Sequence, residues 1–312
     1  MTPQKRTSAS LATRPSLGLV ERGFSILVVA SGTLIVLGTL VRAHGAGLAC
    51  PDWPLCFNRF IPRFDLKVAF EWTHRLVAGS VGFAFLVLAG RVWLRPETRR
   101  IAGGVTLCAA LLLALQVLLG ALTVWKQLAA WTVTAHLLTG NAFTSTLWIT
   151  TLALRERQKV VSRIPLTHSG ARFAVIGVTC LLVLQLLLGG LVSSRYAGLA
   201  CPEWPTCSDG AWFPNWAGAV GLQLVHRGNG YALLLASAAT ALLCRHEPRL
   251  ARLTATGAAL VLAQIAVGVA NVLLRLPVEI TVLHSAIAAL LVLLWTTALR
   301  EAWLAPRTKT SN

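Results

Sequence analysis

Two short segments of the chain pair a histidine with an arginine: EWTHR at 71–75 and QLVHR at 223–227. Histidine is a common metal ligand and the side chain that most readily exchanges protons near neutral pH. In the first segment the carboxyl group of Glu71 stands three residues before the histidine, and in the second the amide Gln223 takes that place. The two segments predict a pair of similar sites, only one of which has an acid.

These segments belong to a longer internal repeat. Three further features occur twice, about 150 residues apart. They are GLACPDWPLC and GLACPEWPTC (47–56 and 198–207), QVLLG and QIAVG (116–120 and 264–268), and His136 and His284. A near-identical stretch of ten residues in register with other matches indicates a duplicated unit.

The composition places these sites in a membrane. Of the 312 residues 55% are hydrophobic and only 12% are charged, whereas soluble domains carry about 25% charged residues. A membrane-spanning helix needs about 20 apolar residues, and two of the uncharged stretches reach that length only if they extend backward through the His-Arg segments. The eight stretches are 23–41, 76–90, 101–125, 127–154, 173–194, 228–244, 253–274 and 280–299.

The predicted fold is an all-α integral membrane protein. Eight transmembrane helices form two tandem four-helix bundles, and a pseudo-two-fold axis along the membrane normal relates them, because each unit has an even number of helices. The predicted division is a tail (1–21), a first repeat (22–155), a linker (156–171), a second repeat (172–303) and a final tail (304–312).

The basic residues predict the orientation. Nineteen of the 28 Lys and Arg residues fall in the tails and connections on one side, so the positive-inside rule places both termini in the cytoplasm. The polar start of the chain (1–16) fits a cytoplasmic tail better than a transit peptide. Since the basic residues are scattered over short loops, the net charge of +17 reflects topology, and we expect no nucleic-acid partner.

Four of the seven histidines occupy equivalent positions in the repeats: His74, His136, His226 and His284. Each precedes the basic end of its helix by 16–19 residues, so all four lie at one height, about 24–29 Å from the inner end. One such histidine can simply hydrogen-bond to a neighbouring helix. Two imidazoles per bundle form the axial ligand set of a haem iron, whereas zinc needs more nitrogen or sulfur ligands.

Each half also carries two cysteines in a loop on the outer side, where disulfides persist. We expect the disulfides Cys50–Cys56 and Cys201–Cys207, each worth about 2 kcal/mol by the loop-entropy argument. They serve either as staples that hold a tryptophan-bearing loop over the site or as redox groups. Both alternatives stay open.

The acid that occurs once has two interpretations. Glu71 and His74 share a helix face, and a carboxyl group close to buried membrane surface is suited to proton transfer. Alternatively, Glu71 forms an ion pair with Arg75 one turn later. Arg227 has no such acid, so the two arginines must share another task, for which haem propionates are candidates.

Together, the repeated cysteine loops, the EWTHR segment and the four histidines resemble those of the haem A synthase family, over about residues 22–303. The resemblance implies oxidation of the C8 methyl group of haem O to a formyl group, which gives haem A for terminal oxidases. It implies haem b on His226 and His284, haem O on His74 and His136, and Glu71 as the catalytic acid. The first cysteine pair is the one linked to function in that family.

The resemblance further implies a multi-pass protein of the bacterial cytoplasmic membrane that receives haem O from haem O synthase, the protohaem farnesyltransferase. The electron acceptor or donor stays unidentified and the oligomeric state open, a homo-oligomer included. Two other functions stay open. One is a di-haem electron-transfer cytochrome, which uses the same histidines and gives Glu71 no task. The other is a haem transporter or chaperone, whose tryptophan-containing outer loops present haem to a partner.

Overall fold

The computed structural model describes residues 15–158, 166 and 170–306, and the long elements in these ranges are helices. The helices are α1 (Pro15–Ala43), α2 (Leu66–Leu94), α3 (Pro96–Trp125), α4 (Ala130–Gln158), α5 (Gly170–Ser194), α6 (Gly218–Leu243), α7 (Pro248–Leu273) and α8 (Val278–Leu304). The predicted tails and linker lie largely outside the described residues. So do His168 and seven basic residues used for the orientation: Lys5, Arg6, Arg14, Lys159, Arg163, Arg307 and Lys309.

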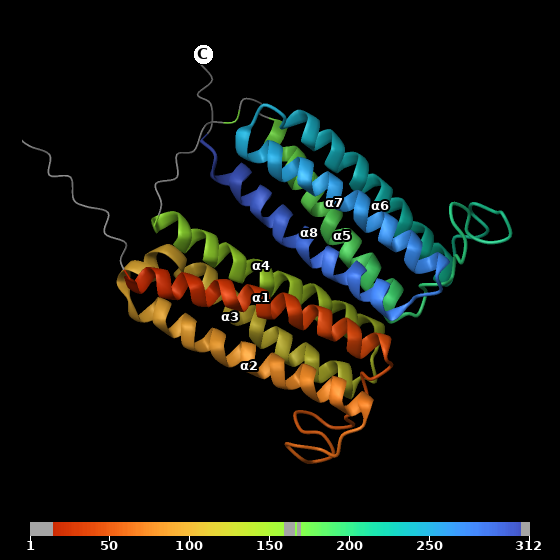
Figure 1. Ribbon diagram of the computed structural model, residues 1–312, viewed down its shortest axis with the longest axis horizontal. Helices are drawn as coiled ribbons and strands as arrows, with labels where there is room; N and C mark the ends of the chain where they lie inside the picture. Colours follow the sequence, from red (N-terminus) through yellow and green to blue (C-terminus); the bar gives the residue numbers. More distant parts are fainter. Residues whose placement is uncertain (1–14, 159–165, 167–169, 307–312) are drawn as a thin grey trace, which may run out of the picture.

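The helices form two four-helix bundles, α1–α4 and α5–α8, which lie side by side (Figure 1). The bundles meet through α1 against α8, α5 against α4, and α4 against α8. The repeat exchanges α1 with α5 and α4 with α8, so this set of contacts maps onto itself, as a two-fold relation requires. The tandem-bundle prediction agrees with this arrangement.

Polar side chains join the bundles along α4 and α8. The indole N–H of Trp148 donates to the Thr297 hydroxyl at 2.7 Å, and Arg300 forms an ion pair with Glu156 near the end of α4. In a second contact, Thr134 of α4 bonds to Ser194 of α5 at 3.2 Å. Such contacts fix the orientation of the two halves more specifically than apolar packing between helices in lipid.

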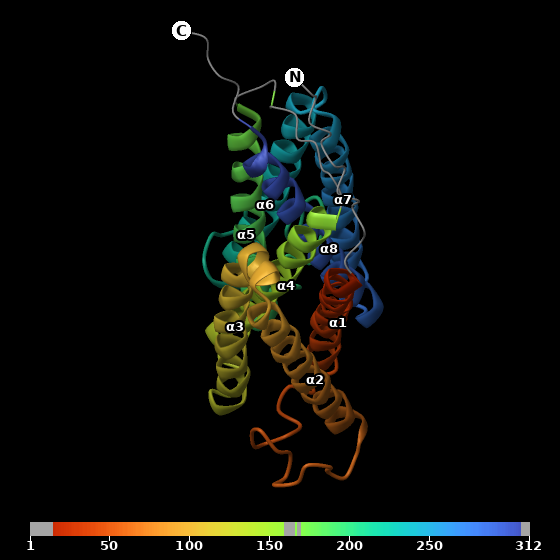
Figure 2. The ribbon, with the colours of Figure 1, turned by 90° about the vertical axis from the view of Figure 1, so that its left-hand side faces the viewer.

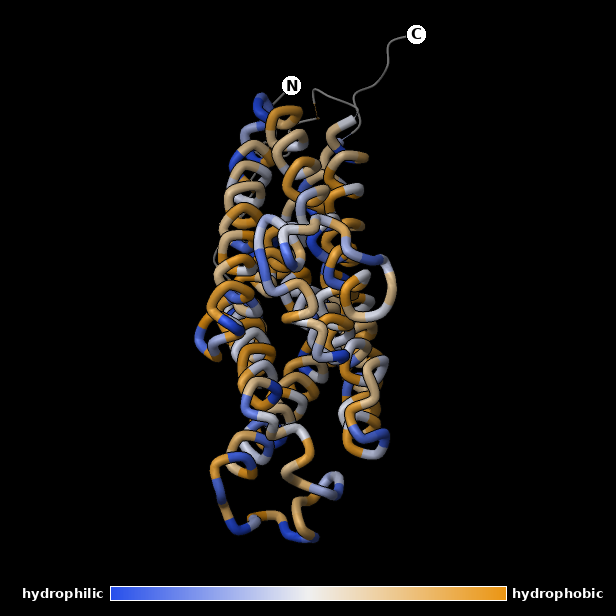
Figure 3. Tube along the Cα trace, turned by 90° about the vertical axis from the view of Figure 1, so that its right-hand side faces the viewer, coloured by the Kyte–Doolittle hydropathy of each residue, from blue (hydrophilic) through white to orange (hydrophobic). Residues whose placement is uncertain are grey.

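Six of the eight helices have the length and composition to cross a membrane, namely α1, α2, α3, α5, α7 and α8. Hydrophobic residues recur along the helices (Figure 3), and exposed side chains such as Ile26 and Leu235 suit contact with lipid. The chain is thus a multi-pass membrane protein.

The other two helices, α4 and α6, carry more polar side chains, and the structure shows what these side chains bind. Helix α4 packs against four neighbours, α1, α3, α5 and α8, and its threonines bond back to carbonyls of their own helix, as Thr150 does to Thr146 at 2.9 Å. Helix α6 carries Gln223, Arg227 and Asn229, which donate to neighbouring loop or helix groups. Satisfied polar groups of this kind are compatible with a membrane interior.

Local sequence sets where several helices begin. The Asp65 carboxylate accepts the Val68 N–H at 2.9 Å and caps α2. Pro96 and Pro248 open α3 and α7, where a missing N–H costs nothing. The cap at Asp65 puts the EWTHR segment in the second turn of α2, directly after the first long loop.

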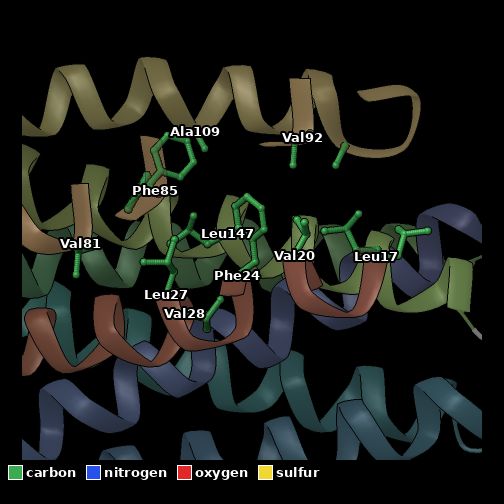
Figure 4. Packing of buried hydrophobic residues seen from close by; sticks show 13 residues of the cluster. Leu17, Val20, Phe24, Leu27, Val28, Val81, Phe85, Val92, Ala109 and Leu147 are labelled. Carbon is green, nitrogen blue, oxygen red and sulfur yellow. The ribbon is translucent and has the colours of Figure 1, made fainter. Parts of the chain in front are cut away.

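Close packing fills the end of each bundle away from the long loops. Phe24, Phe85 and Leu147 converge between the helices (Figure 4), with the two phenylalanine rings edge to face and 6.5 Å apart between centroids. A matching cluster around Trp295 fills the second bundle. Neither cluster includes the histidines, so the histidine ends of the bundles lie outside the close-packed cores.

Candidate functional site

Each of the four histidines packs against a glycine of the preceding helix. A Cβ atom placed on that glycine would lie 3.1–3.3 Å from the Cε1 atom of the ring, closer than most real contacts. The pairs are Gly38 and His74, Gly120 and His136, Gly189 and His226, and Gly268 and His284. A side chain there would displace the ring by a few tenths of an ångström, so glycine lets each imidazole lie this close to its neighbouring helix.

The histidines of each half lie on helices that are diagonal in the bundle. Helix α2 packs on α1 and α3, and α6 packs on α5 and α7, so α4 and α8 stand opposite them. His74 and His136 are near enough to interact electrostatically, as are His226 and His284. This is the arrangement that two axial ligands on opposite sides of one iron need.

The donor set suits a metal that brings its own further ligands. Among the described residues no group of three or more His, Cys, Asp or Glu side chains could hold a metal ion. A zinc site of the usual kind needs more such ligands than one histidine pair offers. In all four rings Nδ1 is buried without a hydrogen-bond partner. Two imidazoles on diagonal helices, each packed against a glycine, fit a porphyrin iron, which supplies four nitrogens itself.

Both predicted disulfides are present. Cys50 pairs with Cys56 and Cys201 with Cys207, with Cα atoms 4.7 and 4.3 Å apart. All four cysteines are buried, and both loops extend from the same end of the molecule; the first projects beyond α2 (Figures 1 and 2). A redox role for the disulfides stays a prediction.

Glu71 links the first loop to α2. One carboxylate oxygen accepts the backbone N–H of Cys50 at 2.8 Å, and the other accepts Nη2 of Arg75 at 2.5 Å. The side chain is 6% exposed, so the ion pair is largely shielded from water. The predicted alternative of an ion pair with Arg75 is thus confirmed, and it coexists with the contact to the disulfide loop.

The two arginines share a task that the sequence did not suggest. Arg75 donates to the carbonyl oxygens of Asp52 and Leu55 at 2.7 and 2.6 Å. Arg227 donates to those of Cys201 and Thr206 at 2.6 and 3.1 Å. Each guanidinium therefore holds its disulfide loop on its helix, a use of several donors in fixed geometry that suits arginine. Contact with haem propionates stays a prediction.

Gln223 occupies the place of Glu71 with different contacts. Its Nε2 donates to the Gly198 carbonyl at 3.2 Å, and its Oε1 is buried without a partner. The amide keeps the loop attached without forming an ion pair. The second half therefore retains the architecture of the site but lacks its charge and its proton acceptor.

An acidic residue fastens the tip of each loop. Asp52 accepts the backbone N–H groups of Phe57 and Asn58, both at 2.7 Å, and the bond from Asn58 is the main cause of a lowered Asp52 pKa. The Thr206 hydroxyl donates to Glu203 at 2.8 Å and is the main cause of a lowered Glu203 pKa. Both carboxylates stabilise their loops in the ionised form.

Sequence reasoning missed two glycines, Gly38 and Gly189. Gly120 and Gly268 belong to the repeated segments given above, and the other pair lies in a further match, LGTLV at 37–41 and LGGLV at 188–192. The spacing to the cysteine loops would have found them, since Gly38 and Gly189 both lie twelve residues before Cys50 and Cys201. His44, which had no assigned role, stacks on Phe70 with ring centroids 4.3 Å apart.

Residues 63–296 match the sequence profile of a family described as cytochrome oxidase assembly protein. The chain belongs to this family. The matched range includes Glu71 and all four histidines, while the first disulfide loop precedes it.

Individual family members support the same relationship. A protein named Heme A synthase from Shewanella oneidensis is 30% identical over 313 positions, covering 86% of this chain and 92% of that protein. Proteins of the same name from Alkalihalophilus pseudofirmus and Shouchella clausii are 31% and 32% identical, covering 67% of this chain and 71% of each relative.

Proposed function

We propose that this chain is a haem A synthase, a membrane oxidoreductase that converts the C8 methyl group of haem O to a formyl group. Family membership and the relatives named for this activity support the proposal. The observation that carries it is a difference between two matched histidine pairs, of which one has a buried carboxylate beside it and the other an amide. Glu71 stands beside one pair, and Gln223, which cannot accept a proton, stands beside the other.

The two halves take different porphyrins in this proposal. His74 and His136 bind the substrate haem O, and His226 and His284 hold a resident haem b. When bound, haem b supplies one-electron transfer. The support is the fit of each imidazole pair, its glycine neighbours and its diagonal helices to an iron that has four ligands of its own.

Glu71 is the proton acceptor for the reaction. Oxidation of a methyl group to a formyl group removes protons as well as electrons, so a base is needed near the porphyrin edge. The ion pair with Arg75 fixes one carboxylate oxygen. The Cys50 N–H fixes the second oxygen, so Glu71 is oriented before the substrate binds.

The proposal includes the orientation and the supply of substrate. Both termini face the cytoplasm and the disulfide loops face outward, in accordance with the positive-inside rule. Haem O comes from haem O synthase in the same membrane. An acceptor or donor that exchanges electrons with the second half completes the reaction, and its identity is left open.

Co-expression tests the function. The chain is produced with a haem O synthase in a bacterium that makes haem b but neither haem O nor haem A, and the membrane haems are extracted and separated by chromatography. Haem A should form only in cells with both proteins. A membrane that holds the folded, haem-loaded chain and haem O but no haem A would contradict the proposal and favour a di-haem electron carrier or a haem transporter.

A further inference from the structure

Three of the four histidines lie near a glutamine on the preceding helix, one turn before the glycine that faces the ring. The fourth, His74, has a leucine there. The sets are Gln116 and Gly120 for His136, Gln185 and Gly189 for His226, Gln264 and Gly268 for His284, and Leu34 and Gly38 for His74. The pairing of α1 with α2 is therefore the exception in a pattern that the other histidines share.

Helix α6 is tied to α5 at the turn that carries His226. Gln185 Nε2 donates to the backbone carbonyl of His226 at 3.2 Å. Asn229 Nδ2 donates to Gln185 Oε1 at 2.7 Å and to the Leu181 carbonyl at 3.1 Å. On the loop side, the Trp204 indole N–H donates to the Tyr231 hydroxyl at 3.0 Å. Polar bonds on two sides hold this ligand turn in place.

Helix α2 lacks all of these ties. The repeat places Leu34, Val77 and Gly79 where α5 and α6 have Gln185, Asn229 and Tyr231. Among the described residues no side-chain hydrogen bond joins α1 to α2 near His74. A cleft of about 450 Å³ also lies between α2 and its loop, with Gly79, Trp72 and Phe60 in its lining, and nothing stands within 4 Å of a Cβ on Gly79.

The outer end of α2 is nevertheless well attached to its own loop. Arg75 and Glu71 bond to the loop backbone, and the Trp72 indole N–H donates to the Phe60 carbonyl at 2.7 Å. The ligand turn and the tip of the loop thus form one hydrogen-bonded unit. The bonds that join this loop to α1 lie at its base, where the Ala46 N–H donates to the Val41 carbonyl at 2.9 Å. Such a unit can move away from α1 without breaking polar bonds between the two helices.

We propose that these positions decide which half exchanges its porphyrin. Gln185, Asn229 and Tyr231 lock α6 and make the second half retain haem, whereas Leu34, Val77 and Gly79 leave α2 free to open and let substrate enter and product leave. The inference rests on the proposed function, since an enzyme that acts on haem must release its product in every cycle. These six are positioning residues, because they act through the helix that carries the ligand.

Transfer of haem to apomyoglobin measures retention directly. The purified full-length chain is prepared without haem O synthase, so haem b is the porphyrin followed, and the Soret band reports its loss. Gln185→Leu with Asn229→Leu, which keeps side-chain size, should release haem b about tenfold faster through the loss of interhelical hydrogen bonds. The matched control is Thr179→Val, whose hydroxyl bonds only to Val175 of its own helix, and it should release haem at the wild-type rate.

The converse exchange tests the first half. Leu34→Gln with Val77→Asn should make that half retain porphyrin, so that chains purified from haem A-producing cells carry more haem A per chain than wild type. Unchanged haem A content in a folded variant would contradict the proposal for this half. A Gln185/Asn229 variant that keeps haem b as firmly as wild type would contradict it for the second.

Hydrogen exchange of the unaltered protein gives a measurement that needs no variant. In nanodiscs without added haem, the backbone amides of 71–79 should exchange faster than those of 223–231, and equal or reversed rates would overturn the inference. Neither this readout nor haem b release requires haem A formation. If no haem A forms in the co-expression test while the exchange and release rates are as expected, the proposed enzyme activity is rejected and the proposed difference in haem retention stands.

Discussion

The two halves of the molecule share a framework and differ in a few side chains. In each half a disulfide loop is held on a helix by an arginine, and two histidines lie against glycines of the preceding helices. Where the first half has the ion pair of Glu71 with Arg75, the second has an uncharged glutamine. Where the second half ties its ligand helix with Gln185 and Asn229, the first has apolar residues.

The comparison separates what a site needs to hold a porphyrin from what it needs to change one. Under the proposed function, the features present in both halves hold the porphyrin: the imidazoles, the glycines and the arginine-bound loops. The proposal assigns the features present in one half, the carboxylate and the apolar boundary between α1 and α2, to reaction and exchange. A duplicated bundle thereby provides an internal control, because each half shows what the other would be without its particular residues.

Removal of the ligands should have the largest effect. His226→Ala or His284→Ala should abolish the stable haem b spectrum of the purified protein, because one imidazole no longer reaches the iron. His74→Ala should abolish haem A formation and leave that spectrum intact. Absorbance spectra of the purified protein and haem extraction from membranes make the comparison. A haem b spectrum that survives loss of either ligand in the second half would show that the ligands were misassigned.

Glu71→Gln makes the two halves alike at this position and should lower haem A formation by about 100-fold or more, the range expected for loss of a catalytic acid or base. The amide can still occupy the space beside Cys50, so haem b should stay bound. Chromatography of extracted haems gives the rate.

The double variant Glu71→Gln with Gln223→Glu is the matched comparison, since it moves the carboxyl group to the other half. It should stay inactive. Recovery of haem A in the double variant, or wild-type activity in the single one, would show that the acid has no specific place in the first half.

Much of the fold could be predicted because few arrangements satisfy a membrane chain. Charge-free stretches gave eight helices, and the internal repeat gave two bundles with the same topology. The polarity of α4 was not foreseen from charge counts, since threonine carries no charge and its hydroxyl bonds to its own helix. Helix α4 lies at the centre of the molecule with four neighbouring helices. This position depends on packing and cannot be inferred from composition.

The site was predictable in its residues and less so in its contacts. Histidines at one depth and cysteines in matched loops follow from spacing. The arginine bonds to loop carbonyls could not be inferred, because a guanidinium accepts many partners and the path of the loop decides which are near. The interhelical bonds of Gln185 likewise depend on which face of α5 meets α6, and this register is set by packing throughout the bundle.

Removal of the disulfides should have a moderate and unequal effect. Replacing Cys50 and Cys56 with serine frees the loop whose Cys50 N–H orients Glu71. Haem A formation should therefore fall about tenfold, which corresponds to a free-energy cost of about 1.4 kcal/mol for the less well oriented carboxylate. Replacing Cys201 and Cys207 should lower the free energy of unfolding by a similar amount, and it should leave the rate of haem A formation within about twofold of wild type. Equal losses of rate in both variants would show that the first loop acts as a structural staple only.

The smallest expected effect concerns the loop tips at low pH. Asp52 and Glu203 have pKa values below their ordinary 3.8 and 4.5, chiefly through the bonds from Asn58 and Thr206. Because these pKa values are lowered in the folded loops, the stabilisation is complete above the ordinary values and is lost as the pH falls through the lowered ones. Pepsin cleavage of each loop should therefore rise below about pH 4, modestly because both groups are exposed. Asp52→Asn should show the increased cleavage of the first loop already at pH 5 while the second loop stays protected, and equal cleavage of both loops in this variant would contradict the local role of Asp52.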